Sequence, residues 1–156
     1  MKYLKTAICE NCEDDMPYYD DQIKMVMRHH EIGPEHVHVD VMVYQAYCGK
    51  CGHPVYPHEL EKKNDIIVYD EYRRKVGLLT SSDIKRIRKK RKMSQVELAR
   101  FIHCGEKNIV RYENGGVQDP VFDYLIRLVD DDVSYKAMKR INDERKQALS
   151  QYSLSY

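Results

Sequence analysis

The sequence contains no tryptophan and only two phenylalanines, so its aromatic content comes almost entirely from 13 tyrosines. Because 33% of the 156 residues are also charged, we expect modest hydrophobic cores. A small domain with a thin core commonly depends on a bound metal or another cross-link. Tyrosine then supplies the aromatic packing, although it is also a residue that is enriched at protein interfaces.

The sequence also lacks a long apolar run, since none approaches the ~20 residues that a membrane-spanning helix needs. Cysteines and acidic residues follow soon after Met1, which excludes the apolar stretch of a secretory signal peptide. We therefore expect a cytoplasmic protein without a membrane partner. In that compartment, paired cysteines bind metal or do redox chemistry more often than they form disulfides.

The net charge of +1 hides an asymmetry between the two halves of the chain. Residues 1–76 carry 10 Lys and Arg against 14 Asp and Glu, a net charge of −4. Residues 77–156 carry 16 against 11, a net charge of +5. Opposite charges indicate two different partners, and only the basic half suits a nucleic acid.

Four of the five cysteines form two pairs, Cys9-x-x-Cys12 and Cys48-x-x-Cys51. Each pair can supply two thiolates to one tetrahedral Zn²⁺ ion, and we predict one structural zinc per chain. A redox dithiol and unrelated core cysteines are the weaker alternatives, because no βαβ context surrounds either pair. Six histidines share this half, and His53 is the candidate for an outer contact to the metal.

Catalysis is not expected of such a site. Four cysteines close the coordination shell that a catalytic zinc leaves open for water. The sequence also has no glycine-rich phosphate loop and no H-E-x-x-H, and it lacks the P-C-x-x-C of the zinc deaminases, since Tyr47 precedes Cys48. We therefore predict that the protein is not an enzyme.

The N-terminal half has the pattern of a small β-rich domain. Val37, Val39, Val41 and Val43 alternate with polar residues, which predicts an antiparallel strand leading into the second cysteine pair. Residues 22–30 are the expected partner strand, and residues 1–16 an extended entry. Pro57 is expected to open a helix over residues 58–75, whose buried side is predicted to include Leu60, Ile67, Tyr72 and Val76.

The C-terminal half has a helical pattern. Ser94 and Glu97 form a capping box, and the helix that follows is expected to bury Val96, Ala99 and Ile102. Other helices are predicted over residues 82–91, 106–113, from Asp119-Pro120 onwards, and 134–149. The predicted fold class is α+β. It comprises a zinc-ribbon-like domain at 1–76, an all-α helix-turn-helix domain at 77–132, and a charged helix or tail at 133–156.

The helix at 106–113 carries the candidate DNA contacts. Ile109 and Tyr112 share one face, while Lys107, Asn108 and Arg111 fall on another and suit guanine and adenine edges. Gln95, at the start of the preceding helix, suits a phosphate. The basic run 85–92 predicts a salt-dependent attraction to DNA. The alternative interpretation makes the run a solvated helix face and Arg111 a surface ion-pair partner.

The segment from Ser94-Gln95 to Asn114-Gly115 resembles the helix-turn-helix of Cro/repressor-type (XRE) regulators. Together with the two upstream Cys-x-x-Cys pairs, it is similar to the MqsA/YgiT-type antitoxins. The runs 77–80, 105–109, 111–115 and 118–119 are most like a phage- and prophage-associated branch. Well-known members have asparagine where this chain has Lys107, which predicts a different base preference.

The resemblance implies a homodimer whose C-terminal domain recognises a palindromic double-stranded DNA operator. It also implies that the N-terminal zinc domain binds a toxin encoded beside it. The predicted function is therefore the antitoxin of a type II toxin-antitoxin system, which represses its own operon and neutralises its toxin. The alternative is a stand-alone prophage or bacterial transcriptional regulator with a structural or sensory zinc domain.

Overall fold

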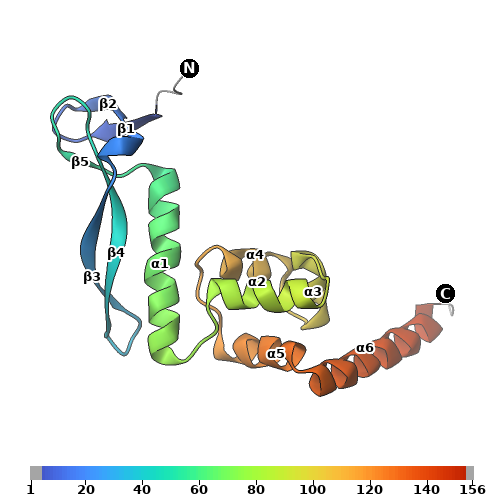
Figure 1. The fold of residues 1–156 in the computed structure, drawn as a ribbon. Helices are drawn as coiled ribbons and strands as arrows, with labels where there is room; N and C mark the ends of the chain where they lie inside the picture. Colours follow the sequence, from blue (N-terminus) through green and yellow to red (C-terminus); the bar gives the residue numbers. More distant parts are fainter. Residues whose placement is uncertain (1–4, 154–156) are drawn as a thin grey trace. The chain divides into compact units, whose positions relative to one another are not determined.

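The computed structural model describes residues 5–153, and its contacts divide the chain into two compact units. Unit 1 runs up to Val76 and unit 2 begins at Gly77 (Figure 1). Unit 1 contains all the strands and one helix, whereas unit 2 is helical throughout its described part. The predicted α+β class is confirmed.

Unit 1 holds two small antiparallel sheets. β1 (Lys5–Cys9) pairs with β2 (Asp14–Tyr18), and a short 3-10 turn, η1 (Asp20–Gln22), follows. The second sheet has the order β3-β4-β5, formed by β3 (Lys24–Ile32), β4 (Val37–Tyr47) and β5 (Pro54–Val55). Of the extended entry predicted for residues 1–16, residues 1–4 lie outside the described part of the chain, and the remainder starts a hairpin. The sequence patterns predict neither β2 nor β5.

The alternating valines of β4 give unit 1 part of its core. Val39, Val41 and Val43 are buried together with Val68 of α1 (His58–Val76). Their neighbours along β4 point to the other side of the hairpin and are exposed, as strand periodicity requires. A second cluster contains Cys9, Cys48, Ala7, Ala46, Val55 and Leu60, so the cysteines are themselves core residues.

α1 keeps most of its predicted apolar side, since Ile67 and Tyr72 pack against the valine cluster. Leu60 is buried as expected, but Val76 is 39% exposed, and the fully buried positions include Asn64 and Arg73. The Asn64 side chain bonds to the backbone of Tyr44 in β4, where its Oδ1 accepts from the N–H and its Nδ2 donates to the carbonyl. A buried polar contact thus replaces apolar packing, which explains the loose hydrophobic pattern of this helix.

Unit 2 consists of five helices with marked starts. These are α2 (Ser81–Lys90), α3 (Gln95–Phe101), α4 (Glu106–Glu113), α5 (Pro120–Asp130) and α6 (Asp132–Ser153). Thr80 and Ser94 each form a capping box with the residue three positions on, and Asp119 caps α5 ahead of Pro120. Within the described part of the chain, no helix combines the length and apolar character needed to span a bilayer.

One continuous apolar core joins α2 to α6. Val96, predicted to be buried, is only half-buried, and Leu98 takes the inward position beside Ala99. Tyr135 of α6 packs on Phe101, with ring centroids 5.3 Å apart, while most of α6 beyond Met138 is exposed. The buried members of this core are Ile84, Ile87, Leu98, Ala99, Ile102, Cys104, Ile109, Tyr112, Ile126 and Val129.

Candidate functional site

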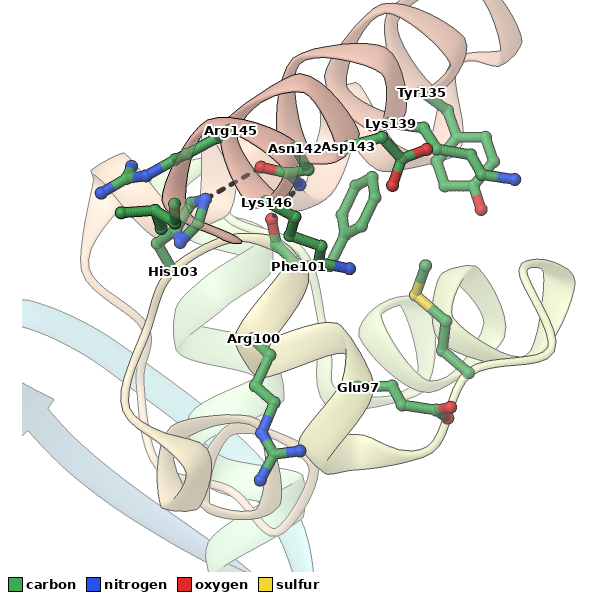
Figure 2. Close-up of a pocket in the computed structure, with 12 residues that line it drawn as sticks. Glu97, Arg100, Phe101, His103, Tyr135, Lys139, Asn142, Asp143, Arg145 and Lys146 are labelled. Atoms are coloured by element: carbon green, nitrogen blue, oxygen red, sulfur yellow. Dashed lines mark hydrogen bonds between the residues drawn. The ribbon is translucent and has the colours of Figure 1, made fainter. Parts of the chain in front are cut away.

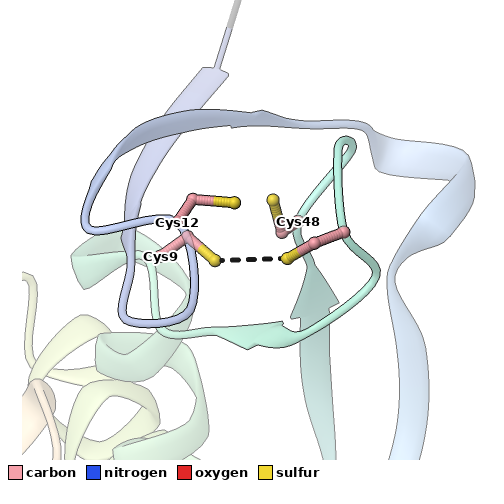
Figure 3. A group of neighbouring side chains, drawn as sticks. Cys9, Cys12 and Cys48 are labelled. Atoms are coloured by element: carbon pink, nitrogen blue, oxygen red, sulfur yellow. Dashed lines mark hydrogen bonds between the residues drawn. The ribbon is translucent and has the colours of Figure 1, made fainter.

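The four paired cysteines converge in unit 1. Cys9 ends β1 and Cys12 lies in the next turn, while Cys48 and Cys51 lie in the turn between β4 and β5 (Figure 3). Backbone hydrogen bonds shape both turns, from Cys12 N–H to the Cys9 carbonyl at 3.1 Å and from Gly52 N–H to the Cys48 carbonyl at 2.9 Å. The four Sγ atoms all lie within 4.8 Å of one another.

These distances fit a metal ion. Four sulfurs at ~2.3 Å from a tetrahedral zinc are separated by about 3.8 Å. The Sγ atoms of Cys9 and Cys51 are 3.5 Å apart, far too long for a disulfide bond. Cys9, Cys12, Cys48 and Cys51 are therefore positioned to bind a metal ion, and no histidine joins the cluster within residues 5–153.

The thiols influence one another's ionisation. Burial raises the pKa of Cys9, and a hydrogen bond with the Cys51 thiol raises the pKa of Cys12 to about 12. The backbone N–H of His53 is the main cause that lowers the pKa of Cys51 to about 6. His53 thus contacts the cluster through its backbone, whereas its side chain is exposed. A bound cation would favour the thiolate form of all four residues.

The predicted DNA-contact residues lie on α3 and α4 of unit 2. Ile109 and Tyr112 are buried, which turns the opposite face of α4 to solvent. Lys107 and Arg111 are exposed on that face, and Asn108 is half-buried near the start of the helix. Neither Lys107 nor Arg111 forms an ion pair with any residue that the structure describes. The Arg111 guanidinium lies over the Tyr112 ring, 5.2 Å from its centroid, and no described carboxylate neutralises either charge.

Gln95 has a contact that the sequence did not reveal. Its Nε2 donates to the Glu113 carboxylate at 2.8 Å, and the same carboxylate accepts from Arg88 Nε at 2.6 Å and Nη2 at 2.9 Å. The Glu113 side chain is only 4% exposed. Burial alone would raise its pKa, but the bonds from Arg88 and Gln95 outweigh that effect and lower it. Through this network, the Gln95 side chain at the start of α3 is held against Glu113 at the end of α4.

The basic run 85–92 is largely bonded within unit 2. Arg86 and Lys90 form ion pairs with Asp130, and Arg91 pairs with Asp132 and lies over the Tyr135 ring. Lys85, Lys89 and Lys92 are exposed and form no ion pair with a described residue. Of the seven cations in the run, Arg86, Arg88, Lys90 and Arg91 pair with acidic residues of other helices or helix ends. Among the described residues, only the three remaining lysines of the run keep an unpaired charge for the predicted attraction to phosphate.

A surface groove of about 550 Å³ lies between α3 and α6 (Figure 2). Asn142 anchors α6 there, since its Nδ2 donates to the Phe101 carbonyl and its Oδ1 lies 2.9 Å from His103 Nε2. The segment predicted as a charged helix or tail is therefore a helix that continues unit 2. The basic residues that line the groove are Arg100, His103, Lys139, Arg145 and Lys146.

A metal-binding knuckle on small β-sheets, followed by a separate helical unit, defines the class of this protein. The family model described as the antitoxin component of the bacterial toxin-antitoxin system, MqsA, matches residues 33–133. This match covers 101 of the 156 residues, so the chain belongs to the MqsA antitoxin family. No curated protein matches the chain.

The family match covers the middle of the chain, residues 33–133. The matched segment contains the second cysteine pair and α1 to α5, whereas Cys9, Cys12 and nearly all of α6 lie outside it. Membership indicates an antitoxin that has a toxin partner. The phage-associated branch stays a prediction.

Proposed function

We propose that this chain is the antitoxin of a type II toxin-antitoxin system, which represses its own operon through α3 and α4 and neutralises a toxin through unit 1. The observation that carries the DNA-binding part is the free polar face of α4. Arg86, Arg88, Arg91, Arg100 and Arg127 of unit 2 each bond to an acidic residue of the same unit. Arg111, by contrast, is exposed without such a partner among the described residues.

In this proposal α4 enters the major groove as the second helix of a helix-turn-helix. Arg111 and Lys107 hydrogen-bond to guanine, and Asn108 contacts adenine. Gln95 contacts a backbone phosphate, and Glu113 sets its position through the hydrogen bond described above. Lys85, Lys89 and Lys92 add the part of the affinity that falls with salt.

A palindromic operator calls for a two-fold symmetric protein, and α5 supports a homodimer. Val121, Tyr124 and Leu128 are exposed at 60%, 66% and 43%. Their spacing of three and four residues places them on one side of the helix. Such an exposed apolar stripe supports burial against a second copy of the chain.

For unit 1 we propose zinc as the metal, because four thiolates in a tetrahedral set are typical of structural zinc sites. When bound, zinc supplies a cross-link between the β1–β2 hairpin and the turn after β4. The sulfurs of Cys9, Cys12, Cys48 and Cys51 would hold it. The net charge of −4 on residues 1–76 supports a basic toxin surface as the partner of this unit.

The DNA-binding proposal is tested with Arg111→Ala and duplex DNA from upstream of the gene. We expect the affinity to fall by ~1–3 kcal/mol, measured by fluorescence anisotropy at fixed salt. Lys63→Ala removes the same charge from α1 and serves as the control with unchanged affinity. Specific binding that survives Arg111→Ala intact would show that α4 is not the reading helix.

The antitoxin proposal is tested by expressing the adjacent gene alone and together with this chain. We expect growth arrest in the first case, rescue in the second, and co-purification of the two products. A harmless neighbour that does not co-purify would favour a stand-alone regulator instead.

A further inference from the structure

The two long edges of the β3–β4 hairpin differ in how unit 1 protects them. Along the β4 edge, the Asn64 side chain satisfies both backbone groups of Tyr44, and Lys75 Nζ donates to the His38 carbonyl at 2.9 Å. β3 lies at the end of the β3-β4-β5 order, so within residues 5–153 no strand pairs with its outer edge. Figure 1 shows β3 on the side of the hairpin away from α1. One edge is covered and the other is open.

The register identifies which backbone groups of β3 point outward. Tyr44 is opposite Met25, and its N–H and carbonyl are bonded to Asn64 rather than to β3. Residues of an antiparallel pair alternate between bonding to the partner strand and pointing away from it. Met25, Met27, His29 and Glu31 therefore present their N–H and carbonyl groups at the open edge.

The same residues carry side chains on the exposed face of the hairpin. Met25 is paired across the strands with Tyr44, and Met27 with Met42. These four side chains are 46%, 40%, 52% and 42% exposed, in that order. Cross-strand neighbours in pairs that are not hydrogen-bonded lie closest together, so they form one apolar patch. Methionine adapts its shape to a partner surface.

We propose that the toxin adds a strand to the open edge of β3 and places apolar side chains on the Met25–Tyr44 and Met27–Met42 patch. The inference rests on the proposed role of unit 1 in toxin binding. An unpaired edge next to an adaptable apolar face is the surface that strand addition uses, with backbone bonds giving affinity and side chains giving specificity.

The net charge of unit 1 indicates which kind of strand would pair with the open edge of β3. Residues 1–76 carry a net charge of −4, so pairing of two copies along β3 brings two acidic units together. A strand from a basic partner gains from the same charge. We therefore assign the edge to a toxin strand with basic flanks and not to a second copy of this chain.

The test compares two substitutions at one position in the full-length, metal-loaded chain. His29→Pro removes an outward N–H and leaves the β3–β4 bonds and the apolar patch in place. His29→Ala keeps the N–H but loses the same side chain and its hydrogen bond with Asp40. With the purified product of the adjacent gene, we expect the Kd for His29→Pro to exceed that for His29→Ala by about tenfold. Equal Kd values for the two variants would overturn the proposal.

The patch is tested separately with Met27→Lys. Ile8→Lys is the control, because Ile8 is an apolar residue of the separate β1–β2 sheet and is 76% exposed. We expect weaker toxin binding for Met27→Lys alone, with the metal content and melting temperature of both variants equal to wild type. Similar losses for the two variants would exclude a role for the patch.

Hydrogen exchange by NMR gives a result that does not depend on variants. We expect the amides of Met25, Met27, His29 and Glu31 to exchange more slowly in the toxin complex than in the free chain. Unchanged exchange at saturating toxin overturns the proposal while leaving the proposed function intact. Exchange at these amides that speeds up on dilution of the free chain would assign the edge to a second copy. If wild type binds no toxin at all, the proposed function itself fails.

Discussion

The two units of this protein are stabilised by different means. Unit 1 buries Asn64, Asp70 and Arg73 alongside its valines, and one of its two apolar clusters contains the metal-binding thiols. Unit 2 has one continuous apolar core and three capped helix starts. A thin core tolerates polar residues only when something else holds its elements together. A metal ion bound by the four thiols would therefore stabilise unit 1 as the continuous apolar core stabilises unit 2.

Removing a metal ligand is expected to have the largest effect on stability and to unfold unit 1 while unit 2 stays folded. Because metal-binding free energy in such a site, ~10 kcal/mol or more, is also folding free energy, Cys48→Ser should unfold unit 1. NMR amide spectra should then lose the dispersed signals of unit 1 and keep those of unit 2. Cys104→Ser, in unit 2, is the matched control and should retain one metal per chain by elemental analysis. Dispersed unit 1 signals without metal would show that unit 1 folds without the ion.

A core truncation in unit 2 is expected to have the opposite pattern. Leu98 is fully buried, so Leu98→Ala should lower the free energy of unfolding of unit 2 by ~2–5 kcal/mol. Chemical denaturation checks this value, while the metal content stays unchanged. The half-buried Val96 provides the control, and Val96→Ala should cost clearly less. A larger loss for Val96→Ala would contradict the inward position of Leu98 in α3.

The buried ion pair between Arg88 and Glu113 is expected to contribute less to the stability of unit 2 than its apolar core does. Glu113→Gln keeps the side-chain size but removes the charge that accepts three bonds from Arg88 and Gln95. We expect a loss of ~1.5–3 kcal/mol in the free energy of unfolding. Glu106→Gln breaks an exposed ion pair with Arg100 and should cost ~0.5 kcal/mol or less. Equal losses would mean that burial does not distinguish the two pairs.

The acid sensitivity that Asp130 of unit 2 contributes is expected to be the smallest effect. Bonds from Arg86 and Lys90 lower the pKa of Asp130 from 3.8 to about 2. A depressed pKa in the folded state contributes stability that is complete above pH ~4 and is lost as the pH falls toward 2. Because the carboxylate is partly exposed, the contribution is ~1 kcal/mol. Melting curves of Asp130→Asn should show a flatter dependence between these pH values than wild type, and identical profiles would contradict the assignment.

Local signals predicted the helices of unit 2 well. The capping box at Ser94 and the Asp119-Pro120 pair each act within one turn of the chain, and both helices begin where those residues predict. The alternating valines of β4 are a similarly local signal. The four cysteines were also predicted together, because the spacing within each pair already defines a metal-binding turn.

The features that could not be predicted from the sequence depend on residues far away in the chain. The acidic partners of the basic run, Asp130 and Asp132, lie about 40 residues further along the chain, so no local pattern connects them. β2 contains two aspartates and Pro17 and lacks an alternating pattern, and it becomes a strand because β1 pairs with it. Val96 and Leu98 could each have faced the core of a seven-residue helix, and the packing of unit 2 decided between them.

The double hydrogen bond between Asn64 and Tyr44 has a consequence for changes in chain length. It fixes both the rotation of α1 about its axis and its position along β4, since a shift of one residue in either element separates the amide from the strand. Insertions between Tyr47 and His58 are therefore tolerated only if the added residues loop out without turning the helix. Changes to the length of this segment should therefore leave the rotation of α1 about its axis, and its position along β4, unchanged.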